Sequence, residues 1–445
     1  MARSEPARGM RDFLPEDVRR REYVIGIIKR VYERYGFEPL ETPAVENLET
    51  LLGKYGEEGN QLIFKILKRG EHEASGQADL ALRYDLTVPL ARVIAHHQSK
   101  LPRLFKRYQI QPVWRADRPA RGRFREFYQC DVDALGSTSP VVEAELCGAV
   151  SEALIELGFN DFTIRLNDRN FLTAILRAVS IPDALHATAL VAVDKLDKIG
   201  VDGVKRELAA RGVTEQATEV LLRVLHAGSQ PAGRVTESIS VLDETGVAAG
   251  SFEKIAAIIN LTVGTPAEGK VVPDFSLARG LSYYTGAIME IQVPDLAGSL
   301  GGGGRYDNLV GMFLGQSIPA SGFSLGLERI LVVMGERGMF PPALASIPAD
   351  VMVAVFDSKD VSHALAVAAR LRAAGLRVLV YPDADKIGKQ IKYADSRGIP
   401  FVAILGSDEI SAGTVTVKHL AGNTQSTYDQ SAAGAAILEV LKRRG

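Results

Sequence analysis

The sequence predicts an α+β core that is interrupted by a helical insertion and followed by a small α/β domain. Strand-like segments stop near residue 170 and resume near residue 266, and the stretch between them is rich in Ala, Leu, Val, Glu and Lys. A Pro-containing stretch at 341–349 resembles a linker, and beyond it strands alternate with helices. We therefore expect a core at 1–169 plus 266–340, an insertion at 170–265, a linker at 341–349 and a last domain at 350–445.

The core is expected to combine amphipathic helices with strands. Apolar residues recur at helical spacing between residues 16 and 35, and Gly36 ends that pattern. Residues 37–43 form a predicted strand closed by Pro43, and the Pro-, Gly- and Arg-rich stretch 117–122 is expected to be a hairpin loop. The remaining predicted elements are strands at 80–87, 104–116, 124–135, 271–277 and 287–293, and helices at 143–157 and 324–334.

The last domain shows a regular alternation of elements. Predicted strands at 351–356, 376–381 and 401–405 are separated by helices that end at Ala374 and lie around 387–396. A further strand at 414–418 and a terminal helix complete the pattern. This alternation predicts a largely parallel sheet.

The composition excludes several classes of protein. Of 445 residues, 46% are hydrophobic and 24% charged, which excludes a disordered tail, a collagen-like fibre and a disulfide-rich miniprotein. Cys130 and Cys147 are too few for a four-ligand zinc site and indicate a reducing compartment, and the seven histidines lack paired ligand spacing. We see neither a secretory signal nor an apolar run near the ~20 residues of a spanning helix. The expectation is a cytoplasmic protein with no membrane partner and no metal held by protein ligands.

The densest chemical signal is a run of basic residues between Arg103 and Arg125, among which Asp117 is the only acid. Guanidinium groups present fixed donor forks that suit phosphate oxygens, so a cluster at a hairpin is a candidate nucleotide or nucleic-acid site. A solvated basic edge that protects a strand from aggregation explains the run equally well.

Three further segments carry candidate residues. Arg279 and the pair Tyr283–Tyr284 lie beside a predicted strand and could meet a polar ligand, although core and turn packing explains them as well. The glycine run 301–304 lacks the ending of a P-loop and is more typical of close approach by a ligand or a neighbouring strand. Arg329 lies in a glycine-bearing amphipathic segment, where a lone arginine is usually a surface ion-pair partner.

Taken together, these segments resemble the signature set of histidyl-tRNA synthetases, a family of class II aminoacyl-tRNA synthetases. Residues 20–43 are similar to motif 1, residues 105–133 to motif 2 and residues 322–329 to motif 3. Residues 277–284 resemble the family's histidine motif and are the most specific match, and residues 8–15 and 303–307 match two further elements. The resemblance implies a class II catalytic core with an antiparallel sheet flanked by helices, a helical insertion and a C-terminal α/β anticodon-binding domain. It also implies a homodimer formed through the helix and strand of motif 1.

The implied activity is that of a histidine–tRNA ligase. With ATP as substrate, it attaches histidine to its tRNA, tRNA(His), through a histidyl-adenylate intermediate. By match to the family, Arg115 and Arg279 are the catalytic arginines, and Mg²⁺ bridges the pyrophosphate oxygens. The ATP-binding residues implied are Arg115, Arg123, Phe127 and Arg329. The histidine-binding residues implied are Asp85, Thr87, Gln129, Asp133, Tyr283 and Tyr284, of which Asp133 and Tyr284 would read the imidazole.

The chain departs from the common bacterial pattern of the family at several positions. Positions 85, 117 and 133 hold Asp where that pattern has Glu, so the pocket must be narrower or a water must intervene. Residues 82–89 and 125–131 are more similar to the eukaryotic-type branch, and Ala120 stands where many bacterial members have Gln. Two alternatives are a non-catalytic paralogue that regulates histidine biosynthesis and a pseudo-synthetase that senses tRNA.

Overall fold

The computed structural model describes residues 4–70, 75–227, 247, 250, 252–278, 283–344 and 348–442. The chain divides into two compact units, Met1–Phe340 and Pro341–Gly445. Every helix within the described residues is too short or too polar to span a bilayer.

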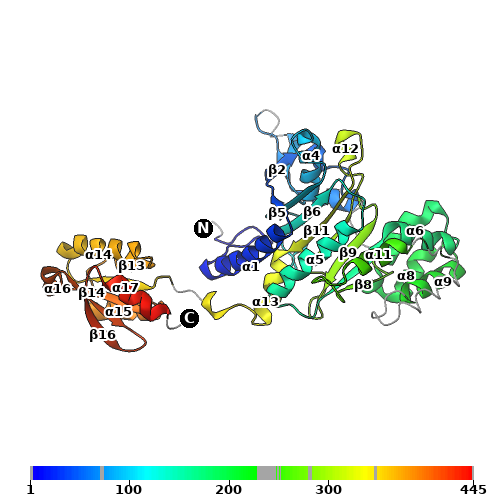
Figure 1. Ribbon diagram of the computed structural model, residues 1–445. Helices are drawn as coiled ribbons and strands as arrows, with labels where there is room; N and C mark the ends of the chain where they lie inside the picture. Colours follow the sequence, from blue (N-terminus) through cyan, green and yellow to red (C-terminus); the bar gives the residue numbers. More distant parts are fainter. Residues whose placement is uncertain are drawn as a thin grey trace. The chain divides into compact units, whose positions relative to one another are not determined.

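The first unit is built on an eight-stranded sheet, with the strand order β1-β5-β6-β11-β10-β9-β7-β8 (Figure 1). The six strands from β5 to β7 pair antiparallel, as expected, whereas β1 and β8 add parallel edges. The strands are β1 Glu38–Pro39, β5 Phe105–Trp114, β6 Glu126–Leu135, β7 Thr163–Asp168, β8 Val271–Pro273, β9 Ala287–Gln292, β10 Gly301–Arg305 and β11 Ala320–Gly326.

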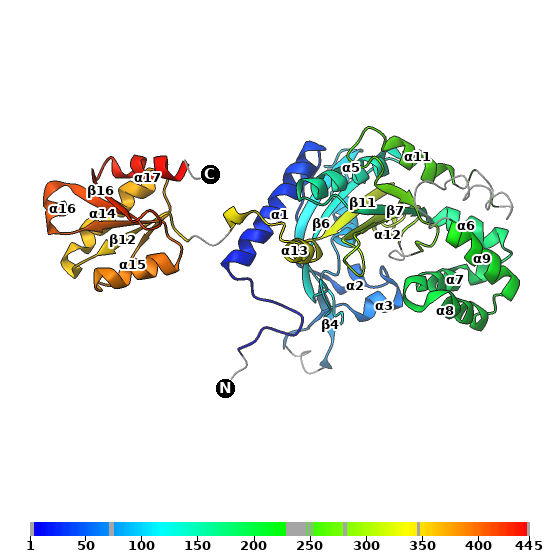
Figure 2. The ribbon, with the colours of Figure 1, turned by 90° about the horizontal axis from the view of Figure 1, so that it is seen from below.

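Helices α1 (Pro15–Arg34), α5 (Val141–Glu156) and α13 (Leu327–Glu336) pack on the central strands of this sheet. Figure 2 shows α1 and α5 side by side, and their residues share one apolar core. Strand β6 contributes Cys130 and Val132 to this core. Because side chains alternate along a strand, Gln129, Asp131 and Asp133 lie on the opposite face of β6, which is therefore polar.

A second apolar cluster surrounds a small three-stranded sheet and the helix α4 (Thr87–His97). The strand predicted at 80–87 is wrong in its second half, because β4 ends at Leu82 and the chain enters α4. Asp85 explains the change, since its carboxylate accepts the N–H of Val88 (3.1 Å) in the first turn of the helix. The remaining elements here are β2 Val45–Asn47, β3 Lys65–Leu67, β4 Ala78–Leu82, α2 Leu48–Leu51, α3 Gly56–Gln61 and α12 Gly311–Leu314.

The described part of the predicted insertion is helical, as expected (Figure 1). Its elements are α6 Arg169–Ala178, η2 Asp183–Leu185, α7 His186–Val193, α8 Leu196–Ala210, α9 Glu215–Ala227 and α11 Glu253–Leu261. The start of the helix predicted at 324–334 is wrong, because residues 320–326 form β11. This segment pairs with both β6 and β10, and tertiary pairing of this kind overrides local helical preference.

The second unit contains a five-stranded sheet in the order β13-β12-β14-β15-β16. Strands β12, β13 and β14 are parallel, but β15 and β16 are antiparallel, so the prediction of a largely parallel sheet is only partly right. Strand β16 has an exposed and polar sequence, which explains why no apolar pattern predicts it. The elements are η5 Pro342–Leu344, β12 Val351–Val355, η6 Ser358–Asp360, α14 Val361–Ala373, β13 Val378–Val380, α15 Ile387–Ser396, β14 Phe401–Leu405, α16 Ser407–Ala412, β15 Thr414–His419, β16 Thr424–Asp429 and α17 Ala433–Lys442.

Candidate active site

A cavity of about 360 Å³ lies on the polar face of the eight-stranded sheet. It collects side chains from the segment before α4, the β5–β6 hairpin, strands β6, β9, β10 and β11, and the start of α13. Residues that are distant in sequence therefore meet in one place. The expected site residues that line the cavity are Asp85, Thr87, Arg115, Arg123, Phe127, Gln129, Tyr283, Tyr284 and Arg329.

The glycine run of β10 provides the floor of this cavity. Among the described residues, a Cβ on Gly302 would meet only the carbonyl oxygen of Met289, at 3.3 Å, so this position opens into the cavity. A Cβ on Gly303 would instead lie 2.2 Å from the carbonyl oxygen of Gly322 on β11. The run thus serves both purposes expected of it, since it leaves room for a ligand and lets a neighbouring strand approach closely.

Three guanidinium groups converge on one end of the cavity. Arg115 donates from Nε to the carbonyl oxygen of Tyr84 (3.0 Å), and its guanidinium carbon lies 4.3 Å from the Tyr84 ring centroid. Arg123 pairs with Asp117 (3.2 Å), and Arg329 donates to the carbonyl oxygen of Ser299. Burial lowers the pKa of Arg329, and the charges of Arg123 and Arg115 lower it further. Such mutual repulsion between cations is relieved when an anion binds among them.

A carboxylate and two tyrosines define the other end of the cavity. Asp85 accepts hydrogen bonds from Tyr55 (2.9 Å) and Tyr283 (3.1 Å), and burial raises its pKa. The rings of Tyr283 and Tyr284 meet edge to face, with centroids 5.2 Å apart. Nearby, Gln129 donates to the hydroxyl of Ser324 (3.0 Å). This end offers acceptors and hydroxyls, which suit an ammonium group and a polar ring.

One expected residue is placed differently, and another lies outside the described residues. Asp133 is not among the described residues that line the cavity, because it lies deeper along β6, where Arg107 and Tyr306 hold its carboxylate. Arg279 lies outside the described residues, so its position relative to the other arginines stays a prediction.

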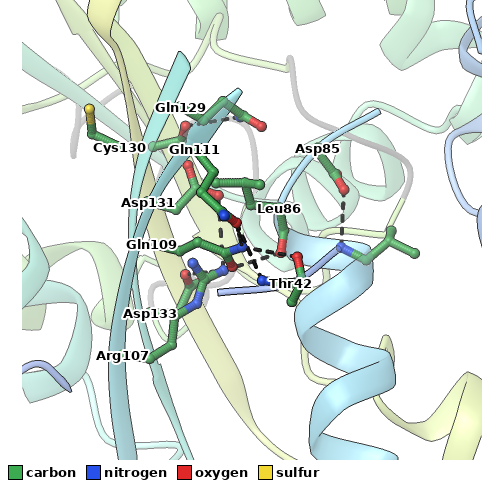
Figure 3. A network of polar contacts seen from close by, with 12 residues as sticks. Thr42, Asp85, Leu86, Arg107, Gln109, Gln111, Gln129, Cys130, Asp131 and Asp133 are labelled. Atoms are coloured by element: carbon green, nitrogen blue, oxygen red, sulfur yellow. Dashed lines mark hydrogen bonds and ion pairs between the residues drawn. The ribbon is translucent and has the colours of Figure 1, made fainter. Parts of the chain in front are cut away.

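Besides Asp117, four polar residues that line the cavity are missing from the site predicted from the sequence: Glu290, Ser299, Ser324 and Glu328. Glu328 accepts from Arg21 (2.8 Å) and from the backbone N–H of Tyr128 (2.9 Å), so it joins α1, β6 and α13. The helix predicted at 324–334 begins at Ser324, but the pairing of this residue with Asp131 between β11 and β6 directs its side chain to the polar face. A count of alternating positions from Gln129 would also have identified Asp131 on this face, where Figure 3 shows both side chains.

The described carboxylates of the cavity are already engaged by protein groups, so a magnesium ion here would be held mainly by substrate phosphates. Within the described residues, no three His, Cys, Asp or Glu side chains form a cluster that could hold a metal ion. Asp85, Asp117 and Glu328 already accept hydrogen bonds or pair with arginines, as shown above. Magnesium commonly keeps several waters and takes most of its protein-site ligands from substrate phosphates, so this arrangement is compatible with it.

Comparison with known proteins gives a consistent result for both units. Residues 9–330 match the family model for histidyl-tRNA synthetase, and residues 350–440 match that of an anticodon-binding domain. The chain is 40% identical to the histidine–tRNA ligase of Christiangramia forsetii, over 97% of this chain and 98% of that protein. The corresponding ligase of Gloeobacter violaceus is 39% identical over 98% of each chain. The solved histidyl-tRNA synthetase of Nostoc sp. PCC 7120 superposes with a TM-score of 0.78, at 32% identity and with full coverage of both chains.

Proposed function

The chain belongs to the histidyl-tRNA synthetase family, and we propose that the cavity of its first unit is the site where histidine is activated with ATP. The protein is a class II aminoacyl-tRNA synthetase that attaches histidine to tRNA at the expense of ATP. The single observation that carries the proposal for the site is the convergence of Arg115, Arg123 and Arg329 beside the acid–tyrosine cluster of Asp85 and Tyr283.

The cationic end of the cavity is proposed to hold the triphosphate of ATP. Arg115 would contact the α-phosphate, Arg123 the phosphates beyond it and Arg329 the γ-phosphate. When the carboxylate of histidine attacks the α-phosphorus, negative charge develops on the oxygens of the pentacoordinate phosphorus. Backbone carbonyl oxygens already hold the guanidinium groups of Arg115 and Arg329, and Asp117 holds that of Arg123, so these groups stabilise the charge without reorganisation. Phe127, whose ring lies 5.2 Å from the Arg115 guanidinium, would stack on adenine.

The opposite end is proposed to bind histidine. Asp85, Thr87 and Gln129 would hold the α-ammonium group, while Tyr284 would contact the imidazole and Tyr283 would line the pocket. A site that pairs both ring nitrogens leaves its own buried polar groups unpaired when an apolar analogue binds. Such sites discriminate by about 10⁴-fold or more, so no editing step is needed.

Arg279 and Mg²⁺ complete the proposed chemistry. By its match to the family motif, Arg279 would contact the α-phosphate from the side opposite Arg115. Magnesium, when bound, would neutralise charge on the leaving pyrophosphate, with its ligands supplied mainly by phosphate oxygens and water. The protein residues contribute the positioning of the two substrates and the fixed positive charge.

The second unit is proposed to bind the anticodon arm of tRNA(His), since it matches an anticodon-binding domain. We further propose a homodimer through α1 and the strand that follows it, and a cytoplasmic location. The non-catalytic paralogue and the tRNA sensor are not favoured, because the full-length relatives at about 40% identity are histidine–tRNA ligases.

The proposal is tested by ATP–pyrophosphate exchange measured with each of the twenty amino acids. We expect exchange with histidine alone. Arg279→Ala is expected to reduce histidine-dependent exchange by on the order of 10²-fold while the fold survives, because an arginine on the transferring phosphorus acts mainly in the transition state. Exchange with another amino acid would disprove the substrate assignment, and unchanged exchange in Arg279→Ala would disprove the role of that residue.

A further inference from the structure

The segment that precedes α1, residues 4–14, has no part in the chemistry proposed above; we call it the pre-helix segment. Most of its residues are exposed, but Gly9, Met10 and Arg11 are half-buried. Gly9 and Arg11 contact the β5–β6 loop, residues 115–125. This loop carries two of the three cations that converge on the cavity, so the contacts lie directly behind the proposed ATP site.

The backbone of Gly9 joins the base of the loop. Its carbonyl oxygen accepts the N–H of Arg125 (2.8 Å), and the carbonyl oxygen of Arg125 accepts the N–H of Arg115 (2.9 Å). Gly9 has a φ of +83°, and a Cβ at this position would lie 2.8 Å from Cγ of Arg125 and 3.0 Å from Cγ of Pro119. Both the backbone conformation and the close approach to the loop therefore require glycine here.

Arg11 makes the second contact, through its guanidinium group. The guanidinium carbon lies 3.3 Å from the centroid of the Phe124 ring, and Phe124 lines the cavity. Nη2 of Arg11 is buried without a hydrogen-bond partner among the described residues, and Oε1 of Glu328 lies 3.8 Å away from it. Burial lowers the pKa of Arg11, so the group gives up hydration at this place. A partly desolvated cation is attracted to an aromatic ring more strongly than one that remains in water.

Two further contacts connect this support to the cations of the cavity. Arg125 donates from Nε to the carbonyl oxygen of Asp117 (3.0 Å), and the carboxylate of Asp117 pairs with Arg123 (3.2 Å). Arg115 is bonded to the backbone of Arg125, as described above. Because Arg115 and Arg123 both repel Arg329, the loop gains from an attachment outside the cavity until an anion binds.

The start of α1 does not depend on these contacts. Pro15 occupies the first turn of the helix, and the N–H of Leu14 donates to Oδ2 of Asp17 (3.3 Å), so the helix has N-terminal support of its own. Gly9 and Arg11 are directed to the loop instead. Their positions are explained by the loop and the cavity rather than by the helix that follows them.

We propose that residues 9–11 are a positioning element of the ATP site and that Arg11 is its central positioning residue. By holding Phe124 and Arg125, this element keeps Arg115 and Arg123 where the phosphates of ATP bind. Arg11 itself is not among the described residues that line the cavity, so it acts through the loop. The inference rests on the proposed function, because it assumes that ATP occupies the cationic end of the cavity.

The first test compares Arg11→Gln with a matched control, Arg20→Gln, in the full-length protein. Arg20 and Arg11 both line a neighbouring cavity of about 230 Å³, but the guanidinium carbon of Arg20 lies 5.0 Å from the Phe340 ring and away from the loop. In pyrophosphate exchange, we expect Arg11→Gln to raise KM for ATP by about fivefold and to leave KM for histidine within about twofold. Arg20→Gln should leave both KM values within about twofold. Arg11→Lys keeps a cation on the ring and should recover most of the loss.

A double substitution identifies the contact through which Arg11 acts. Phe124→Leu removes the ring, so the addition of Arg11→Gln to this variant should change KM for ATP by less than about twofold. A further increase of about fivefold in the double variant would mean that Arg11 acts independently of Phe124, and it would overturn the inference.

Limited digestion with trypsin measures the loop without reference to activity. Trypsin cleaves after arginine, and the loop offers Arg121 and Arg123 as sites, which mass spectrometry of the fragments identifies. Cleavage of a folded protein follows the population of locally opened states. Without substrates, cleavage at these two sites should therefore be about fivefold faster in Arg11→Gln than in the wild-type protein and unchanged in Arg20→Gln. Equal cleavage in Arg11→Gln and wild type, or equal rises in both KM values, would overturn the inference.

These measurements also separate the inference from the proposed function. If the wild-type protein shows no exchange with any amino acid, the proposed function fails and the inference falls as far as it concerns ATP, while the trypsin rates still decide whether the segment holds the loop. If the wild-type protein is active with histidine and Arg11→Gln matches it in both KM values and cleavage, only the inference is overturned.

Discussion

Replacement of Asp131 by Asn should change how the stability of the first unit depends on pH. Burial raises the pKa of Asp131 from 3.8 to about 7, so the folded protein binds a proton more tightly than the unfolded chain. The proton on Asp131 therefore adds to the unfolding free energy at low pH, and this contribution is lost as the pH rises toward 7. At about 1.36 kcal/mol per pH unit, the wild-type protein should lose about 3 kcal/mol between pH 5 and pH 8 through this group. Asn cannot titrate and should not show this loss.

The groups around Asp131 reinforce the same trend. Arg107 on β5 stays paired with Asp133 in the variant, and the pKa of Asp133, which is also raised by burial, should fall when the neighbouring charge is removed. Asp85, Tyr284 and Tyr306 remain in place. The difference in unfolding free energy, variant minus wild type, should therefore increase between pH 5 and pH 8.

The assay is urea unfolding followed by tryptophan fluorescence. The chain has a single tryptophan, Trp114 at the end of β5, so the signal reports the first unit without interference from the second. Asp202→Asn on the exposed surface of α8 serves as a matched control and should show no such trend. A difference between Asp131→Asn and wild type that is flat with pH, or that has the opposite sign, would refute the reasoning.

Three further predictions concern the cavity and its supports. Arg329→Ala should raise KM for ATP in pyrophosphate exchange by about tenfold or more and leave KM for histidine nearly unchanged, because one of three converging cations is lost. An equal rise in both KM values would contradict the assignment of Arg329 to the triphosphate. Gly302→Leu should keep its thermal stability and lose pyrophosphate exchange, because the leucine side chain enters the cavity. Gly303→Ala should instead be destabilised by about 1–3 kcal/mol, because its Cβ overlaps β11. A destabilised Gly302→Leu together with an unaffected Gly303→Ala would contradict the assignment of this run as the cavity floor. Glu328→Gln should lower the unfolding free energy by about 3 kcal/mol, measured by the same fluorescence, because the buried charge of Arg21 would lose its carboxylate partner. An unchanged unfolding free energy would mean that the Arg21–Glu328 pair orients these side chains without stabilising the fold.

The sequence by itself determined the class of the fold, the family and nine of the residues that line the cavity. Hydrophobic periodicity marks α1 and the β5–β6 hairpin because each buries one face locally, and the signature segments match the family without reference to any contact. It also indicated that the run at Gly302 would be approached closely, since a strand without side chains needs such a reason.

Only the tertiary structure decided what each polar residue faces. Alternation places Gln129, Asp131 and Asp133 on one side of β6, but the groups around Asp133 come from elsewhere in the chain: Arg107 on β5, Tyr306 after β10 and Gly322 on β11. The same holds for Asp85, whose contact with Val88 turns an expected strand into the start of α4. The physical reason is that burial and charge pairing are sums over neighbours distant in sequence, so a local pattern can nominate an acid but cannot say whether its oxygens are already taken.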